Sequence, residues 1–115
     1  MMFGLPDQTR LAMQRVFAGY PEIQKVVIYG SRAKGNYRPG SDIDLTLLGE
    51  AIDNTILSKV LVDLDDLNTP YLMDVSIFNQ LSSSDLIGHI QRVGQVFYDR
   101  EAFSAIEKVC EGDVV

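Results

Sequence analysis

The sequence predicts an α/β (α+β) fold in which helices flank a small mixed β-sheet, formed by a single domain over residues 1–115. The 115 residues are 46% hydrophobic and 23% charged, a composition typical of one soluble globular domain. Helical and strand-like hydrophobic patterns alternate along the chain, which indicates a sheet covered by helices. The first two predicted strands are joined by a compact segment rather than a full crossover helix, so a mixed sheet is favoured over an all-parallel one.

The first part of the chain is predicted to form a helix and two strands. Pro6 and Asp7 suit the start of a helix that ends near Gly19, because proline is common in a first turn and glycine at a C-cap. The β-rich run 25–29 (KVVIY) predicts a buried strand. The run 42–48 (DIDLTLL) alternates polar and apolar residues, as a half-buried strand does.

The remaining elements continue the alternation of helix and strand. Asp53 is expected to cap a helix whose apolar residues recur at helical spacing and which ends before Asn68. The run 71–78 (YLMDVSIF) predicts a third strand, and the segment 82–94 (SSSDLIGHIQRVG) a helix capped by one of its serines. A short fourth strand and a closing helix are expected over 95–98 and 101–110.

Composition and charge exclude several classes of protein. No apolar run approaches the roughly 20 residues of a membrane-spanning helix, and the first residues (MMFGLPDQTR) lack the layout of a signal peptide. Cys110 is the single cysteine, so neither an internal disulfide nor a zinc site is expected, and the expected location is the cytoplasm. The net charge of −6 argues against non-specific nucleic-acid binding.

The charge is divided unevenly along the chain. Up to Arg38 the chain holds six Lys/Arg and two Asp/Glu, whereas the remaining 77 residues hold four Lys/Arg and 14 Asp/Glu. A basic front part and an acidic remainder indicate a localised anion site, the alternative being a chance distribution.

Two carboxylates two residues apart, Asp42 and Asp44, are predicted to share one face of a strand. Alternate strand residues have Cα atoms about 6.5–7 Å apart and point the same way. Such a pair offers the oxygen ligands that Mg²⁺ prefers. The alternative is that both are ordinary solvent-facing strand residues, although Asp is disfavoured in strands.

Gly30 and Ser31 follow the first predicted strand directly. A strand that leads into Gly-Ser and then into a helix start lets backbone N–H groups meet a phosphate. Gly and Ser are also common turn residues, so the pair alone is a weak signal. The segment matches neither the P-loop nor the G-x-G-x-x-G pattern, which excludes both of those nucleotide-binding classes.

A third carboxylate, Asp74, interrupts the apolar third strand. An unpaired charge buried in a core strand is costly, so a metal shared with Asp42 and Asp44 would supply the missing partner. The alternative is that this strand lies at the edge of the sheet with Asp74 exposed.

Together, Gly30-Ser31, Asp42-Ile43-Asp44 and Asp74 resemble the signature of the nucleotidyltransferase superfamily with the DNA-polymerase-β-like core. The run GSRAKG…SDIDL is similar to the minimal nucleotidyltransferase group in particular, with Lys34 where the group more often has Arg. The run IGHIQRVGQVFYD also resembles the tail of that group. The resemblance covers roughly residues 10–100 and implies one minimal nucleotidyltransferase domain.

The resemblance implies Mg²⁺-dependent transfer of a nucleoside monophosphate, most simply AMP from ATP. Asp42, Asp44 and Asp74 would be both the catalytic residues and the ligands of two Mg²⁺ ions. The remaining implied contacts are with the phosphates of the nucleoside triphosphate: Gly30, Ser31, Arg32 and Lys34. Arg38 is a further candidate, weighed equally against a role in solvating a surface turn.

The resemblance also implies a partner protein. Minimal nucleotidyltransferases pair with a HEPN-domain RNase toxin, and the expectation is an antitoxin that adenylylates this partner on a tyrosine. Only about 15 residues follow the core, so the acceptor surface is expected on another chain, either a second copy in a homodimer or a different protein. The closing segment offers apolar residues for such an interface or, more commonly, for the core: Phe97, Phe103 and Ile106.

Two other functions stay open. The first is a catalytically silent module that neutralises a HEPN partner by binding alone. The second is a nucleotidyltransferase that acts on a small molecule such as an aminoglycoside, or on an RNA end. His89 is expected to be a surface or half-buried residue rather than a general base, and the acidic cluster Asp63, Asp65 and Asp66 the solvated face of a helix.

Overall fold

A four-stranded mixed sheet forms the centre of the protein in a computed structural model that describes residues 2–38 and 40–104. The strand order is β3-β2-β1-β4. The strands are β1 (Lys25–Tyr29), β2 (Ile43–Leu48), β3 (Met73–Ile77) and β4 (Gln95–Asp99). β1 pairs antiparallel with β2 and β4, whereas β3 runs parallel to β2. The predicted fold class, a mixed sheet flanked by helices, is confirmed.

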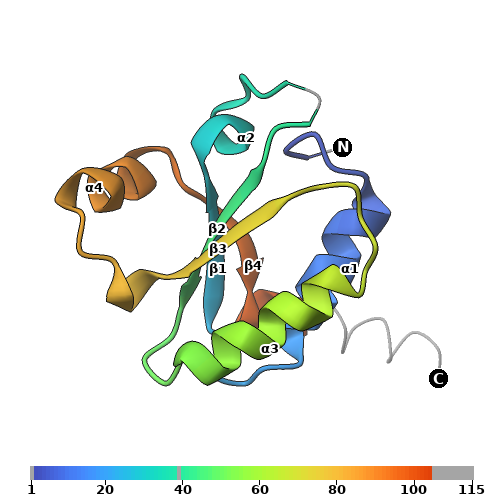
Figure 1. The fold of residues 1–115 in the computed structure, drawn as a ribbon, viewed down its shortest axis with the longest axis vertical. Helices are drawn as coiled ribbons and strands as arrows, with labels where there is room; N and C mark the ends of the chain where they lie inside the picture. The colour runs from blue at the N-terminus through green and yellow to red at the C-terminus, as the bar shows by residue number, and fades with distance from the viewer. Residues whose placement is uncertain (1, 39, 105–115) are drawn as a thin grey trace.

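The helices cover the two faces of the sheet unequally (Figure 1). α1 (Asp7–Ala18) and α3 (Asn54–Asp65) lie together on one face. α4 (Ser84–Val93) lies on the other face, and the single turn α2 (Gly30–Lys34) follows β1 at one end of the sheet. A 3₁₀ turn, η1 (Phe78–Gln80), leads from β3 towards α4. The second face therefore has one helix where the first has two.

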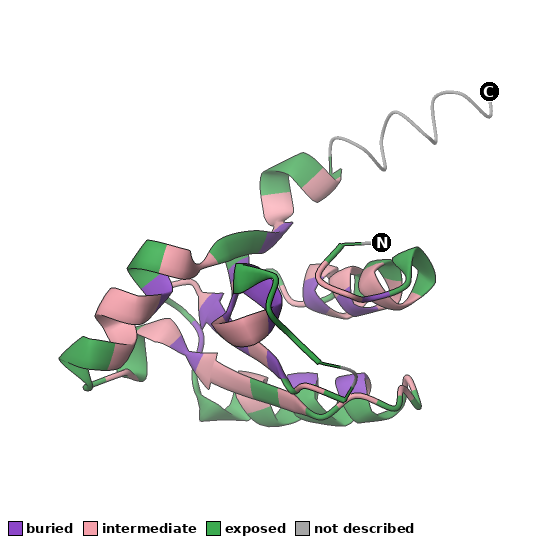
Figure 2. Ribbon diagram, turned by 90° about the horizontal axis from the view of Figure 1, so that it is seen from above, coloured by how far each residue is buried: buried purple, intermediate pink, exposed green. Residues whose placement is uncertain are grey.

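The hydrophobic core lies between the sheet and the α1–α3 layer. The strand residues that point into it are fully buried: Val26, Ile28, Ile43, Leu45 and Leu47. Figure 2 shows that α3 buries its side toward the sheet and exposes the opposite side. Each aliphatic side chain removed from water contributes about 1.5–3 kcal/mol to folding. Because side chains alternate along a strand, burying this set directs the intervening residues of β2, Asp44 and Thr46, to the second face.

The predicted helix caps are confirmed. The Asp53 carboxylate accepts a hydrogen bond from the Ile56 N–H at 2.9 Å, and the Ser83 hydroxyl accepts one from Leu86 at 3.3 Å. Gly19 is the C-cap of α1. α3 ends at Asp65, somewhat earlier than predicted, and Asn68 adopts a left-handed φ of 54° that a helix cannot continue through.

The closing segment contributes to the core. Residues 100–104 are helical, as predicted, and the rest of the predicted helix lies outside the described residues, with Ile106. Phe97 is buried, and half-buried Phe103 packs on Tyr98 with ring centroids 5.6 Å apart. Of the two roles expected for Phe97, the core or a partner interface, the structure shows a core residue. Across the described ranges, no helix is both long and apolar enough to cross a bilayer.

Candidate active site

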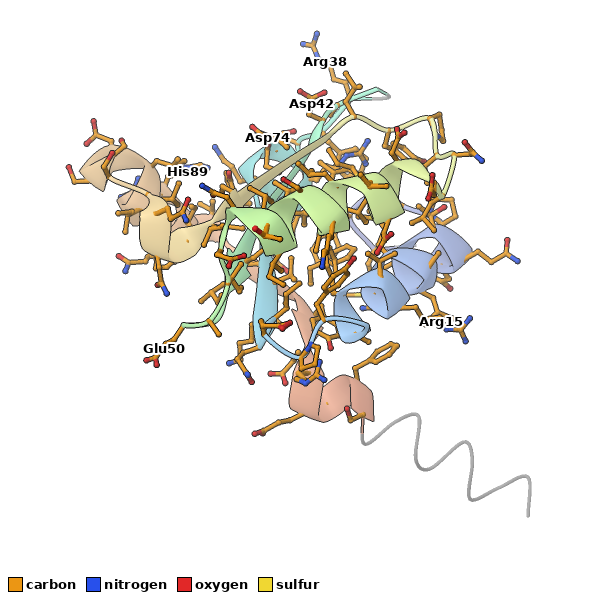
Figure 3. The ribbon with its side chains drawn as sticks, turned by 60° about the horizontal axis from the view of Figure 1, so that its bottom comes forward. Arg15, Arg38, Asp42, Glu50, Asp74 and His89 are labelled. Carbon is orange, nitrogen blue, oxygen red and sulfur yellow. The ribbon has the colours of Figure 1, made fainter. Side chains whose placement is uncertain are left out.

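The three predicted carboxylates meet at one end of the sheet, where β1 ends and β2 and β3 begin. In the sheet register, Asp44 on β2 is paired with Tyr29 on β1 and with Asp74 on β3. Asp42 lies two residues before Asp44, just ahead of β2. Figure 3 shows Asp42 and Asp74 close to each other at this end. The parallel pairing of β2 with β3 is what joins residues 30 positions apart in the sequence.

Asp74 reaches this site from an exposed position, so the expectation that it is buried in a core strand is wrong. β3 is an edge strand, and Asp74 is exposed rather than buried in the core. The cost of burying a lone charge therefore does not explain Asp74, and the alternative of an exposed edge position is the observed one. What links Asp74 to the site is its registered pairing with Asp44.

Asp44 is the most enclosed of the three carboxylates. Its pKa is raised above the ordinary 3.8, first by burial and then by the negative charges of Asp74 and Asp42, while His89 opposes the shift. Like charges held this close favour a bound cation, because the cation removes their mutual repulsion.

Gly30 gives Asp44 the space it occupies. Gly30 has a left-handed φ of +75°, and an added Cβ would lie 2.3 Å from Asp44 Oδ2. Both facts demand glycine, because a side chain is strained at this φ and would displace the carboxylate. The group that packs against Gly30 in the structure is thus the carboxylate of Asp44.

Ser31 and Lys34 belong to the single turn α2 beside the carboxylates. The Ser31 carbonyl accepts hydrogen bonds from Gly35 (2.9 Å) and Asn36 (3.2 Å), which close the turn. Ser31 is half-buried and Lys34 is exposed. Arg38 lies further out on the loop and points away from Asp42 (Figure 3). Ser31 thus directly follows the glycine that packs on Asp44, Lys34 lies at the exposed end of α2, and Arg38 extends into solvent.

Arg32 has a different set of contacts from the one expected for a phosphate-binding residue. It is only 3% exposed. Its Nε and Nη2 donate to the Ser41 carbonyl at 3.1 and 2.9 Å, and its Nη1 to the Phe3 carbonyl at 2.8 Å. The guanidinium of Arg32 is therefore hydrogen-bonded to backbone carbonyl groups of the protein.

Sequence reasoning missed a polar layer on the same face, below the carboxylates. Ser76 donates to the Thr46 hydroxyl at 3.0 Å, and Thr46 is fully buried. Burial raises the pKa of Tyr29, as do the charges of Asp74 and Asp44, while a hydrogen bond with Ser76 opposes the shift. The two-residue alternation from Asp44 to Thr46 and from Asp74 to Ser76 is a sequence signal that could have found this layer.

His89 approaches the site from α4. Its ring meets Tyr29 edge-on, with centroids 6.3 Å apart and an interplanar angle of 82°. The prediction of a half-buried histidine is confirmed. Its nearness to Tyr29 depends on how α4 packs on the sheet, for which the sequence carries no local signal.

The carboxylates fit a Mg²⁺ site that is completed by other ligands. All three offer the hard oxygen donors that Mg²⁺ prefers, and the charge crowding at Asp44 favours a cation. Within residues 2–38 and 40–104, no three His, Cys, Asp or Glu side chains form a ready-made metal cage. Mg²⁺ in nucleotide enzymes is commonly bound by one or two carboxylates together with water and substrate phosphates, which this open arrangement permits.

Carboxylates on two strand starts beside a Gly-Ser turn define the class of protein as a nucleotidyltransferase core. The sequence model of the family "Polymerase beta, Nucleotidyltransferase" matches residues 12–103, and the chain belongs to this family.

Solved structures with a similar fold include several toxin–antitoxin complexes. A chain of a toxin–antitoxin crystal structure with AMP-PNP is 18% identical, with 96% of this chain and 90% of that chain covered and a TM-score of 0.63. A chain of the MntA–HepT complex is 15% identical over 95% and 89% of the two chains, with a TM-score of 0.61. A chain of the complex between the tri-AMPylated Shewanella oneidensis HEPN toxin and the MNT antitoxin is 15% identical over 86% and 76%, with a TM-score of 0.60. Among curated proteins, no relative matches.

Proposed function

We propose that this chain transfers a nucleoside monophosphate, AMP from ATP, to a hydroxyl group of a HEPN-domain partner protein, and so acts as an antitoxin. The observation that carries the proposal is the registered pairing of Asp44 with Asp74, with Asp42 beside them and the Gly30–Ser31 turn at the same end of the sheet. Family membership supports the reaction class.

Each site residue has a role in the proposed reaction. Asp42, Asp44 and Asp74 would hold the two Mg²⁺ ions. Bound Mg²⁺ would neutralise charge on the triphosphate and lower the pKa of the attacking hydroxyl. Asp74 is exposed, so an acceptor hydroxyl from another molecule can reach it and pass its proton there. The turn that begins at Gly30–Ser31, with Lys34, would orient the outgoing pyrophosphate.

The similar structures support the identity of donor and acceptor. One of them is described as containing AMP-PNP, and another an AMPylated HEPN toxin bound to an MNT antitoxin. Both share the fold of this chain over most of their length, which makes ATP and a HEPN-domain protein the first molecules to test.

The decisive experiment combines the purified chain with ATP, Mg²⁺ and the HEPN-domain protein and measures intact masses. We expect the partner to gain the mass of AMP, and Asp44→Asn and Asp74→Asn to abolish the gain. Glu50→Gln is the matched control, since Glu50 is an exposed carboxylate just beyond the opposite end of β2 (Figure 3).

The other outcomes separate the competing functions. A stable complex with no mass gain would show a silent neutralising module. No complex, together with transfer to an aminoglycoside or an RNA end, would show a different acceptor for the same chemistry.

A further inference from the structure

We propose that Arg32 is a positioning residue of the carboxylate site, which holds Asp42 in place for the cation without touching the cation itself. The inference rests on the proposed function, because it assumes that Asp42 and Asp44 bind a divalent ion. It assigns to Arg32 a role other than the phosphate contact expected from the sequence.

The guanidinium of Arg32 grips the peptide group immediately before Asp42. Nε and Nη2 both donate to the Ser41 carbonyl, at 3.1 and 2.9 Å. The following peptide is fixed as well, because the Ile43 N–H donates to the Leu72 carbonyl at 2.8 Å. Hydrogen bonds therefore fix the peptide groups on both sides of Asp42. The bonds to the preceding peptide group come from Arg32.

Two aromatic rings keep the guanidinium in this orientation. The Arg32 Cζ lies 5.2 Å from the ring centroid of Tyr37 and 5.1 Å from that of Tyr71. Tyr37 belongs to the loop before Asp42, and Tyr71 to the segment that enters β3 three residues before Asp74. Arg32 thus links the strand starts that carry two of the carboxylates.

The same arginine ties the N-terminal turn to the site. Its Nη1 donates to the Phe3 carbonyl at 2.8 Å. Gly4 packs so closely on Tyr37 that an added Cβ would lie 2.3 Å from Tyr37 Cε2. Of the segments that Arg32 contacts, two lead to carboxylates: Ser41 directly precedes Asp42, and Tyr71 lies three residues before Asp74.

Among its described residues, the loop that carries Asp42 makes few hydrogen bonds to the rest of the protein besides those with Arg32. Gly35 and Gly40 both adopt left-handed φ values, of +85° and +87°. A short turn is closed by hydrogen bonds between Arg38 and Ser41, at 2.9 Å each, but this turn is local to the loop. Within the described residues, Arg32 supplies the side-chain hydrogen bonds that anchor the loop to the body of the protein.

Lysine cannot replace this arginine. A planar guanidinium presents several N–H donors in one fixed fork, whereas a lysine ammonium is a compact charge without that geometry. Arg32→Lys therefore keeps the charge and much of the packing and removes the simultaneous grip on Ser41 and Phe3.

The test is the affinity for Mn²⁺, used as the probe ion and measured from the electron paramagnetic resonance signal of free Mn²⁺. We expect Arg32→Lys to weaken binding about tenfold, as is typical when a residue that orients a metal ligand is lost. Tyr71→Leu, which removes one ring and keeps the hydrogen bonds, should weaken binding by a smaller factor. Urea unfolding of each variant reports whether it is folded.

Arg100→Lys is the matched control. Arg100 also donates to backbone carbonyls, those of Ala18 (3.5 Å) and Tyr20 (3.4 Å), at the opposite end of the sheet from the carboxylates. We expect it to lower stability and leave the Mn²⁺ affinity unchanged. Equal affinities for Arg32→Lys and wild type, or equal losses for Arg32→Lys and Arg100→Lys, would overturn the positioning role.

Measuring transfer in parallel separates this inference from the proposed function. If wild type binds Mn²⁺, Arg32→Lys binds it more weakly and neither transfers AMP, the positioning role stands and the proposed reaction fails. If wild type transfers AMP and Arg32→Lys binds Mn²⁺ as tightly as wild type, the proposed reaction stands and the positioning role fails. A wild-type protein that binds no Mn²⁺ overturns the positioning role, and the transfer assay then decides the proposed function on its own.

Discussion

The two faces of the sheet use the same strands for different purposes. On the α1–α3 face, Leu45 and its neighbours are completely buried in an apolar layer. On the α4 face, Ser76 donates a hydrogen bond to Thr46, and a hollow of about 330 Å³ is lined by Val27, Ile90 and Val96 among others. The closed face supplies the stability that lets the open face hold three like charges together.

Asp44→Asn, on the α4 face, is expected to have the strongest effect on AMP transfer. Asp44→Asn keeps the size of the side chain and removes its charge, so it should lower kcat/KM for AMP transfer on the order of 10³-fold, comparable to losing other groups that neutralise charge in phosphoryl transfer. The measurement is partner modification by intact mass, with circular dichroism to show that the variant is folded. Transfer at the wild-type rate would contradict the metal-binding role of Asp44.

The adjacent residue tests the other face. Leu45→Ala removes a fully buried side chain and should lower the free energy of unfolding by about 2–5 kcal/mol. Urea denaturation measures the loss. Transfer per folded molecule should stay within a few-fold of wild type, and a specific loss of transfer would show that the two faces are not separable.

A pair of glycine variants tests the contact between Gly30 and Asp44 on the α4 face. Gly30→Ala and Gly35→Ala both place a side chain at a left-handed φ, +75° and +85°, so each should lose about 1–2 kcal/mol of stability. At Gly30 the new methyl also meets Asp44 Oδ2, whereas at Gly35 no described atom lies within 4 Å. Mn²⁺ binding should therefore weaken in Gly30→Ala alone. Equal binding by the two variants would refute the steric link between Gly30 and Asp44.

The smallest effect is on the pH dependence of stability without metal. The pKa of Asp44 is raised in the folded protein, so folding disfavours its ionised form. The stability contributed by the protonated carboxyl is present below about pH 3.8, its ordinary pKa, and is lost as the pH rises through the higher folded value. Asp44→Asn should thus be more stable than metal-free wild type at neutral pH, with the difference disappearing in acid. Urea denaturation at both pH values measures this, and added Mg²⁺ should stabilise wild type only.

Local sequence signals predicted the elements well. The run 25–29 is a strand with those limits, and the Asp53 carboxylate caps α3 as expected, because a β-rich run and an N-cap depend on adjacent residues. The three carboxylates could also be selected from the sequence, and the structure brings them to one end of the sheet.

Long-range pairing accounts for what the sequence could not show. Asp74 is exposed because β3 is the edge strand, and edge position depends on the whole sheet order. Arg32 binds the carbonyls of Phe3 and Ser41, which lie 29 and 9 residues away. Asp63 was expected to be solvated with its acidic neighbours, yet it accepts a hydrogen bond from Tyr20, which raises the pKa of that tyrosine to about 12.

The contact between Gly30 and Asp44 also sets a limit on mutational tolerance. The carboxylate already fills the space that a single methyl on Gly30 would need. Asp44→Glu lengthens the side chain that packs against Gly30, so this exchange is also expected to move the carboxylate. The two positions are therefore coupled, because a larger residue at position 30 displaces the carboxylate at position 44. Any redesign of this site has to consider both positions together.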